Sequence, residues 1–322
     1  MKKVNPETAD PFAPVHEPTD PELEQMLSMM RMAAAALPPI TSFTPQQLRA
    51  QAEQTTPAPV RRDDAVERSV PGPAGAIPIR ILGTHSSPRA VYVRFHGGGW
   101  IGGAYDHQDE MLHAFGERLG AAIVSVDYRL APEARFPEPI DDCEAAALWV
   151  IENALSEFGT DAVLIGGDSA GAYLTAATIL RLRDRHGYTG FRGADLRYGM
   201  YDLRLTPSVR HYKERGLNEE NLRWLLDHVV DAELREELSP LLADLGGLPP
   251  AIFTCGTEDS LLDDTLFMWA RWRAAGNDAE LALYPGAPHA FDLAPLKVGA
   301  QAIDRVVEFL DGRLAALATT PA

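Results

Sequence analysis

One pentapeptide constrains this chain more than any other stretch: Gly167-Asp168-Ser169-Ala170-Gly171, which has the form G-x-S-x-G. It follows the short apolar run Ala162–Ile165, and the segment Ala172–Arg185 after it carries apolar residues at helical spacing. Strand, tight glycine turn and helix together predict a nucleophile elbow, in which small flanking residues let the serine hydroxyl stand clear of the backbone. Taken alone, so short a pattern is explained as well by an ordinary glycine turn.

A second glycine-rich stretch upstream favours the elbow. His96-Gly97-Gly98-Gly99-Trp100 follows the apolar run Val91-Tyr92-Val93. An H-G-G-G loop in this place gives backbone amides to the oxyanion hole, and the residue after the serine, here Ala170, gives another. Donors of this kind are each worth about 3–4 kcal/mol of reaction barrier. We expect the His96 ring to brace the loop rather than to exchange protons.

A serine hydroxyl is a weak nucleophile until a base takes its proton, and the base needs a third group to orient it. With this elbow the expected chain order is serine, then an acid, then histidine. His289 is the only histidine after His228, and it lies in a turn-rich loop just past a predicted strand. We therefore predict His289 as the base, and we favour Asp259, just past the predicted strand Ala251–Cys255, as the acid.

Other acids compete for the orienting role. Glu258 is adjacent to Asp259. Asp263 and Asp264 lie in the next turn, where acids more often complement a helix N-terminus. Asp292 is only three residues beyond His289, and the local backbone makes it a poor orienter.

From about residue 66 onward, strands alternate with helices, which predicts a mostly parallel sheet covered by helices on both faces. The clearest predicted strands are Ile77–Leu82, Ala90–Phe95, Ala121–Val126, Ala162–Ile165, Ala251–Cys255 and Glu280–Tyr284. The helices expected in this region are His107–Leu119, Asp141–Asn153, Ala170–Arg185 and Pro295–Leu317.

Two regions fall outside this alternation and predict a helical cap. Pro21–Leu37, which is unusually rich in methionine, and Thr44–Gln54 have the pattern of helices. Between Leu196 and Leu238 the alternation fails, and Asn218–Val230 there predicts an amphipathic helix. We expect the methionines to fill a cap interface rather than to line an apolar ligand site. The predicted domains are 1–55, the N-terminal part of the cap; 56–195, the first part of the catalytic domain; 196–238, the cap insertion; and 239–322, the second part of the catalytic domain.

Composition excludes several functions. The formal charge of −17, from 29 basic and 46 acidic residues, argues against nucleic acid or an anionic membrane surface as a partner. The two cysteines form no disulfide framework and no metal-type spacing, and no H-E-x-x-H motif is present. The sequence has no leader-type apolar segment and no stretch long enough for a membrane span, so we expect a soluble cytoplasmic protein.

Further motifs follow one another in a recognisable order over roughly residues 70 to 315. They are His96-Gly97-Gly98-Gly99-Trp100, Asp127-Tyr128-Arg129-Leu130-Ala131-Pro132-Glu133, Phe136-Pro137, Asp142, Trp149, the G-D-S-A-G elbow, Leu248-Pro249-Pro250, Asp259 with Leu261 and Asp263, and His289 with Phe291. In this order the chain resembles the hormone-sensitive-lipase-like family of α/β-hydrolases, the bacterial family IV esterases.

The resemblance implies an α/β-hydrolase fold with a helical cap, and no cofactor or metal. It implies Ser169 as nucleophile, Asp259 as orienter and His289 as base. It also implies an oxyanion hole from the amides of Gly98, Gly99 and Ala170, with Gly97 in the same loop. This chain departs from the family pattern at three positions: Ala172 replaces the second glycine after the elbow serine, Ser260 replaces the proline after the acid, and Ala290 replaces the glycine after the histidine.

These motifs predict a serine carboxylesterase acting on short- to medium-chain acyl esters, with a small-molecule ester as its partner. An amidase or arylformamidase would use the same mechanism, and a non-catalytic receptor would use the same fold. A dinucleotide-binding reading rests on Gly97-Gly98-Gly99-Trp100-Ile101-Gly102, which fits G-x-G-x-x-G, and on Asp127 at the end of the next strand. Bulky Trp100 inside the turn argues against it. The sequence leaves the oligomeric state open, with a homodimer as one option.

Overall fold

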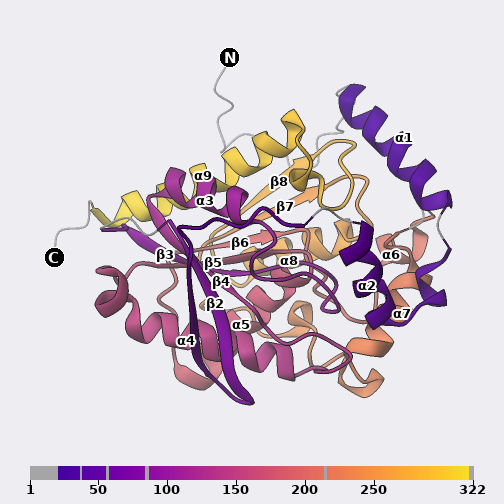
Figure 1. Cartoon of the computed structure of the whole chain (residues 1–322). Coiled ribbons are helices and arrows are strands. Elements are labelled where there is room, and N and C mark those ends of the chain that lie inside the picture. The colour runs from indigo at the N-terminus through magenta and orange to yellow at the C-terminus, as the bar shows by residue number, and fades with distance from the viewer. Residues whose placement is uncertain (1–20, 37, 56–57, 84–86, 214–215, 319–322) are drawn as a thin grey trace.

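A computed structural model describes residues 21–36, 38–55, 58–83, 87–213 and 216–318 of the chain (Figure 1). Residues 1–20, the beginning of the predicted N-terminal part of the cap, lie outside the described residues. Within the described part, eight strands form one sheet in the order β1-β2-β4-β3-β5-β6-β7-β8. The pairs β1/β2 and β2/β4 are antiparallel, and the remaining pairs are parallel. The strands are β1 (Val66–Gly72), β2 (Gly75–Leu82), β3 (Ala90–Phe95), β4 (Ala121–Val126), β5 (Val163–Asp168), β6 (Gly193–Arg197), β7 (Ala251–Gly256) and β8 (Ala279–Tyr284).

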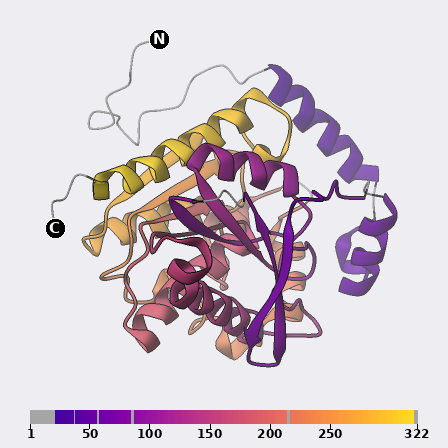
Figure 2. The same ribbon diagram turned by 60° about the vertical axis from the view of Figure 1, so that its left-hand side comes forward.

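Helices cover both faces of this sheet, and successive strand residues face opposite layers. On β3, Tyr92 packs with the cluster beneath α3 and α9, whereas Val91 and Val93 pack beneath α4, α5 and α8. Figure 2 shows α3 and α9 lying along the same side of the sheet. These helices are α3 (Asp109–Leu119), α4 (Glu138–Phe158), α5 (Ala170–His186), α8 (Leu262–Ala274) and α9 (Lys297–Ala318). The arrangement is the α/β-hydrolase fold that the sequence predicts.

The remaining helices gather at one end of the molecule, on the right in Figure 1. They are α1 (Pro21–Ala36), α2 (Pro45–Thr55), α6 (Pro207–His211) and α7 (Glu219–Val229), together with the short 3₁₀ helix η1 (Ile40–Ser42). Three further 3₁₀ helices are η2 (Ala232–Leu234), η3 (Pro240–Leu242) and η4 (Phe291–Leu293). The α7 helix contacts both α6 and η1. On α1, Leu23 is buried, but Met29 and Met32 are 63% and 72% exposed, so these two methionines fill no interface here.

All six strands predicted from sequence are present, and two more were missed. β1 has one buried residue, Val70, and therefore no apolar run to reveal it. β6 carries Asp195 and Arg197 in a fully buried strand, a pattern that apolar periodicity does not detect. Their side chains form an ion pair at 3.1 Å, which is how the strand tolerates both charges. The α8 helix was also missed, apart from the acids of its first turn.

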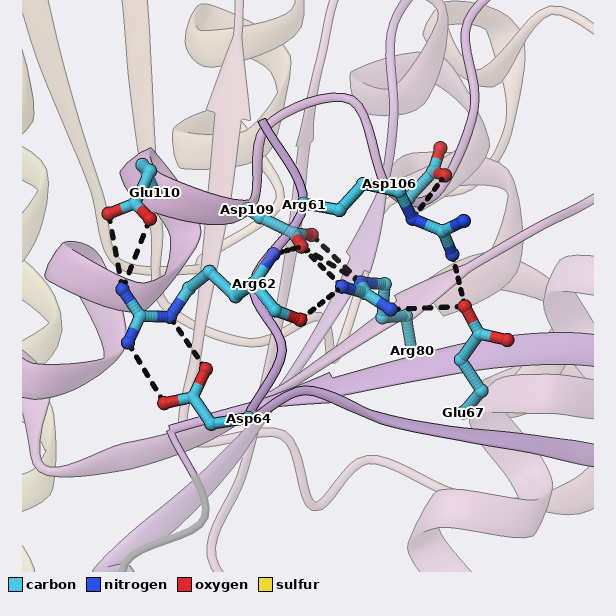
Figure 3. Close-up of polar contacts among 8 residues, drawn as sticks. All are labelled: Arg61, Arg62, Asp64, Glu67, Arg80, Asp106, Asp109 and Glu110. Carbon is cyan, nitrogen blue, oxygen red and sulfur yellow. Dashed lines mark hydrogen bonds and ion pairs between the residues drawn. The ribbon is translucent and has the colours of Figure 1, made fainter. Parts of the chain in front are cut away.

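An ion-pair network anchors the segment that precedes β1 to the sheet (Figure 3). Its centre is the pair formed by Arg80 of β2 and Asp109 at the start of α3, with side chains only 4% and 0% exposed. The Arg80 Nε donates to both Asp109 carboxylate oxygens at 3.0 Å. The Arg62 amide donates to Asp109 Oδ2 at 2.7 Å, and the Arg62 carbonyl accepts from Arg80 at 2.8 Å. Both backbone polar groups of Arg62, its amide and its carbonyl, are therefore bonded to this pair, which holds the chain just before β1 in place.

We predict that Asp109→Ala lowers the free energy of unfolding by about 3–5 kcal/mol, because it leaves a buried guanidinium without its main partner. Asp64→Asn is the matched control, since Asp64 pairs with Arg62 at the surface and contributes little. Urea denaturation followed by circular dichroism measures both. Equal unfolding midpoints for the two variants would show that the Arg80–Asp109 pair does not stabilise the fold.

Candidate active site

The predicted elbow joins β5 to α5 at Ser169, whose backbone has φ 54° and ψ −117°. Residues other than glycine rarely adopt a positive φ, and such strain persists only where the surroundings enforce it. A Cβ on Gly171 would lie 2.0 Å from the Phe95 carbonyl oxygen, and one on Gly167 would lie 2.6 Å from the same atom. The Ser169 amide donates to the Arg197 carbonyl of β6 at 2.9 Å. The turn is therefore enclosed between β3 and β6, and a side chain at either glycine of the pentapeptide would clash with the backbone of β3.

The structure brings Ser169, His289 and Asp259 together in one line of hydrogen bonds. His289 Nε2 lies 2.8 Å from Ser169 Oγ, and His289 Nδ1 lies 2.8 Å from Asp259 Oδ2. The other carboxylate oxygen of Asp259 accepts the Leu261 amide at 2.9 Å. The Asp259 side chain is fully buried, whereas the His289 side chain is 21% exposed. Ser169 is half-buried, so the serine and the imidazole are both partly accessible.

The competing acids have other partners. Glu258 is exposed. Asp263 accepts the Ser208 amide at 2.8 Å, and buried Asp264 accepts the amides of Tyr201 and Asp202 at 2.7 and 2.8 Å. Both thus tie the start of α8 to the segment after β6. Asp259 is the carboxylate that hydrogen-bonds the His289 ring.

The environment of His289 favours its protonated form. Burial alone would lower the pKa of the imidazole, but the adjacent Asp259 carboxylate opposes this by its charge and its hydrogen bond. Asp168 and Asp292 add further negative charge, and the net result is a pKa raised above its ordinary value of 6.5. A histidine of this kind takes a proton readily and stabilises the imidazolium that results.

The glycine loop after β3 lies directly against the elbow. Gly98 and Gly99 have φ of 118° and 62°, and a Cβ on Gly98 would lie 2.2 Å from the Gly102 carbonyl oxygen. A Cβ on Gly97 would lie 2.5 Å from an Asp168 carboxylate oxygen. Among the loop and turn bonds of the described residues, no backbone carbonyl accepts the amides of Gly98, Gly99 or Ala170. These three amides therefore have no backbone acceptor among the described residues.

Two aromatic residues fix this loop. Trp100 is buried, and its indole Nε1 donates to the Ala170 carbonyl at 3.1 Å, which connects the loop to the first turn of α5. The His96 ring stacks on Tyr128 at 4.2 Å, and its Nδ1–H donates to the Gly97 carbonyl at 2.8 Å. Burial lowers the pKa of His96 to about 3, so the ring is neutral. His96 thus braces the loop, as its sequence position predicts.

The three departures from the family pattern have different consequences. Ala172 is fully buried, so its methyl fits at the start of α5. The Ser260 hydroxyl is buried and has no partner among the described residues. Ala290 has a left-handed backbone with φ 58°, which a glycine would adopt without strain. The strained position is thus the one directly after His289.

Sequence reasoning missed Arg197, the last residue of β6, and Tyr198, which follows it; Arg197 contacts Ser169, and Tyr198 contacts His289. The only available signal was a charged pair, Asp195 and Arg197, two residues apart in a short segment that was not assigned to a strand.

In the described part of the chain, no three His, Cys, Asp or Glu side chains are grouped so as to hold a metal ion. In the same residues, no helix is both long and apolar enough to cross a membrane.

The fold and this site define an α/β-hydrolase with an elbow serine, a histidine and an aspartate in one hydrogen-bonded line. A family model described as the alpha/beta hydrolase fold matches residues 92–293. The carboxylic ester hydrolase LipN of Mycobacterium tuberculosis is 34% identical over 84% of this chain and 76% of its own length. An acetyl esterase of Salmonella schwarzengrund is 32% identical over 69% of this chain and 72% of its own.

Solved structures agree with these relatives. A hormone-sensitive lipase from a metagenome library superposes with a TM-score of 0.79 and is 27% identical, covering 91% of this chain and 98% of the lipase chain. The chain therefore belongs to the α/β-hydrolase family, in its hormone-sensitive-lipase-like branch, as its ordered motifs predict.

We predict that Gly171→Ala destabilises the protein by about 1–3 kcal/mol, because its methyl would push the elbow off the Phe95 carbonyl. Gly312→Ala is the matched control: Gly312 lies in α9 with open space around it, so alanine should stabilise the helix by about 0.5–1 kcal/mol. Thermal unfolding of the two variants gives opposite shifts. A Gly171→Ala protein as stable as the wild type would contradict the close contact between elbow and β3.

Proposed function

We propose that this protein is a serine carboxylesterase that hydrolyses short- to medium-chain acyl esters through an acyl-enzyme. The observation that carries the proposal is the line of hydrogen bonds from Ser169 through His289 to buried Asp259. Support comes from relatives that are named carboxylic ester hydrolase and acetyl esterase. Ester hydrolysis needs no cofactor in this mechanism.

The first half of the reaction transfers the acyl group to Ser169. His289 Nε2 removes the serine proton while Oγ attacks the ester carbonyl carbon, and Asp259 stabilises the imidazolium that forms. The carbonyl oxygen becomes an oxyanion, which accepts hydrogen bonds from the amides of Gly98, Gly99 and Ala170, with Gly97 shaping the same loop. The tetrahedral intermediate then collapses, and the alcohol leaves with the proton from His289.

The second half repeats these steps with water. His289 removes a proton from a water molecule, whose oxygen attacks the acyl carbon of the Ser169 ester. The same amides stabilise the second oxyanion, and collapse returns the proton to Ser169 Oγ as the carboxylic acid is released. Each proton that His289 takes is given back, so the ring is neutral at the start of every half-reaction.

The limit on acyl length follows from the helices that we propose as the cap, residues 1–55 and 196–238. On α7, the Leu225 side chain approaches the oxyanion loop so closely that a Cβ on Gly99 would lie 3.2 Å from it. From α2, the Arg49 guanidinium donates to the carbonyls of Ile101 and Ala131 at 3.1 and 3.0 Å, which holds this helix against the same loop. An apolar side chain this near the loop limits the room for an acyl chain.

We predict that Ser169→Ala abolishes hydrolysis of chromogenic acetyl, butyryl and octanoyl esters, and that palmitoyl esters are poor substrates of the wild type. Asp259→Asn should lower kcat by about 10⁴-fold, since the histidine loses its orienting partner. Ser156→Ala is the matched control, because Ser156 is exposed on α4. Undiminished activity of Ser169→Ala would refute the nucleophile assignment.

A matched series of anilides, measured with the wild type, tests for amidase activity.

The pH dependence should report the raised pKa of His289. Only neutral His289 can accept the serine proton, so kcat/KM is lost as pH falls through that pKa. Because Asp259 raises the pKa, we expect the midpoint of this loss above the ordinary histidine value of about 6.5. Steady-state kinetics on an ester whose own hydrolysis is corrected for gives the profile. A midpoint below about 6.5 would contradict the ion pair between His289 and Asp259.

A further inference from the structure

The end of β6 contacts both halves of the candidate site. The Arg197 carbonyl accepts the Ser169 amide at 2.9 Å, so the backbone of this strand holds the nucleophile turn. The ring of the next residue, Tyr198, makes an edge-to-face contact with the His289 ring, with centroids 4.9 Å apart and planes at 67°. The dipeptide Arg197-Tyr198 thus contacts both the serine and the histidine.

The side chain of Arg197 belongs to a buried charge cluster. Its NH1 donates to Asp292 Oδ2 at 2.7 Å, and its Nε donates to Asp195 Oδ2 at 3.1 Å. The Tyr92 hydroxyl donates to the same Asp195 oxygen at 3.1 Å. Arg197 is 3% exposed, and the side chains of Asp195 and Asp292 are fully buried. This cluster of two carboxylates around one guanidinium is isolated from bulk solvent.

Tyr198 completes the cluster on the side of His289. Its hydroxyl donates to Asp292 Oδ1 at 2.5 Å, so both oxygens of Asp292 are engaged. Its amide donates to the Thr254 carbonyl of β7 at 2.7 Å, and its backbone has a strained φ of 40°. The ring is completely buried. Asp292 thereby orients the Tyr198 ring, which packs against His289.

Asp292 also fixes the loop that carries His289. It lies three residues further along, in η4, after Ala290 has turned the chain with its left-handed backbone. A Cβ on Gly299 would lie 3.0 Å from the Asp292 Cα, so α9 packs closely behind it. The loop therefore has two anchors, Asp259 at the imidazole and Asp292 at the backbone beyond it.

We propose that Asp292, held by Arg197 and Tyr198, is a positioning residue for His289 and keeps its Nε2 aimed at Ser169 Oγ. The proposal rests on the roles of Ser169 and His289 proposed above. Asp292 does not touch the reacting atoms and acts through the Tyr198 ring and the His289 loop. The role differs from that of Asp259, which bonds the imidazole directly.

The same carboxylate contributes charge to the site. The charged or titratable groups that face His289 are Asp259 from the loop after β7, Asp168 at the end of β5, Asp292 from η4 and Tyr198 after β6. Asp168 is paired with Arg94 at 2.6 Å, whereas the single charge of Arg197 is shared between two carboxylates. Removing the charge of Asp292 makes an imidazolium at His289 less favourable.

Asp292→Asn tests the proposal because it keeps the shape of the side chain and removes its charge. We expect kcat to fall about 10- to 100-fold through misplacement of His289, with KM changed less than about twofold. The midpoint of the acid limb of kcat/KM should move to lower pH. Tyr198→Phe keeps the ring and the charge, so it should lower kcat without moving the limb.

The double variant separates positioning from two unrelated defects. If Tyr198 and Asp292 act through one hydrogen bond, the losses in kcat of Tyr198→Phe and Asp292→Asn should not multiply in the double variant. Asp109→Asn is the control for removal of a buried carboxylate, since the Arg80–Asp109 pair belongs to the network that precedes β1 (Figure 3). It should lower the unfolding temperature and leave both kcat and the acid limb unchanged.

The outcomes distinguish this proposal from the proposed function. If Ser169→Ala stays active, the proposed function fails. If Ser169→Ala is inactive but Asp292→Asn and Tyr198→Phe both keep the wild-type kcat and acid limb, only the positioning role is overturned. Should Asp292→Asn not fold, Tyr198→Phe decides: a wild-type kcat overturns the role, and a lowered kcat at unchanged KM supports it.

Discussion

The contact between the elbow and the end of β3 is the constraint from which the rest of the site follows. Gly171 can approach the Phe95 carbonyl only without a side chain, and Gly97 approaches Asp168 in the same way. Two backbone segments from neighbouring parallel strands therefore meet directly. Their meeting holds the glycine loop against the turn that carries Ser169 before any substrate arrives, and the oxyanion role that we propose for the amides of this loop and of Ala170 depends on such preorganisation.

Buried charges support this contact from within the sheet. The Arg94–Asp168 pair joins β3 to the elbow, and Arg197 joins β6 to Asp292 and hence to the His289 loop. Replacing such pairs by apolar residues is often neutral or stabilising, so they are weak contributors to stability. Here each pair fixes the position of a residue close to a proposed reacting group: Asp168 is adjacent to Ser169, and Asp292 lies in the loop of His289.

The sequence predicted the parts of the molecule that repeat a simple pattern. Apolar runs located six strands, and the chain order of Ser169, Asp259 and His289, each just past a predicted strand, predicted residues that the fold then brings together. Patterns of apolar residues could not reveal β6, because Asp195 and Arg197 make it look like a surface segment until their partners are known. Likewise, the sequence predicts only that Asp292 is a poor orienter of His289, because its contact with Tyr198 depends on a register between distant segments.

Backbone strain in the described residues is concentrated where these contacts converge. The non-glycine residues with positive φ are Trp100, Ser169, Tyr198, Leu205 and Ala290, and all except Leu205 adjoin the glycine loop, the elbow or His289. Each such residue costs of order 1–3 kcal/mol and persists only where its surroundings over-determine it. Trp100 has its indole bond to Ala170, and Tyr198 has Asp292. Ala290 has only the anchors of its loop on either side, Asp259 through His289 and Arg197 through Asp292, so these two contacts hold the strained backbone in place beside the proposed base.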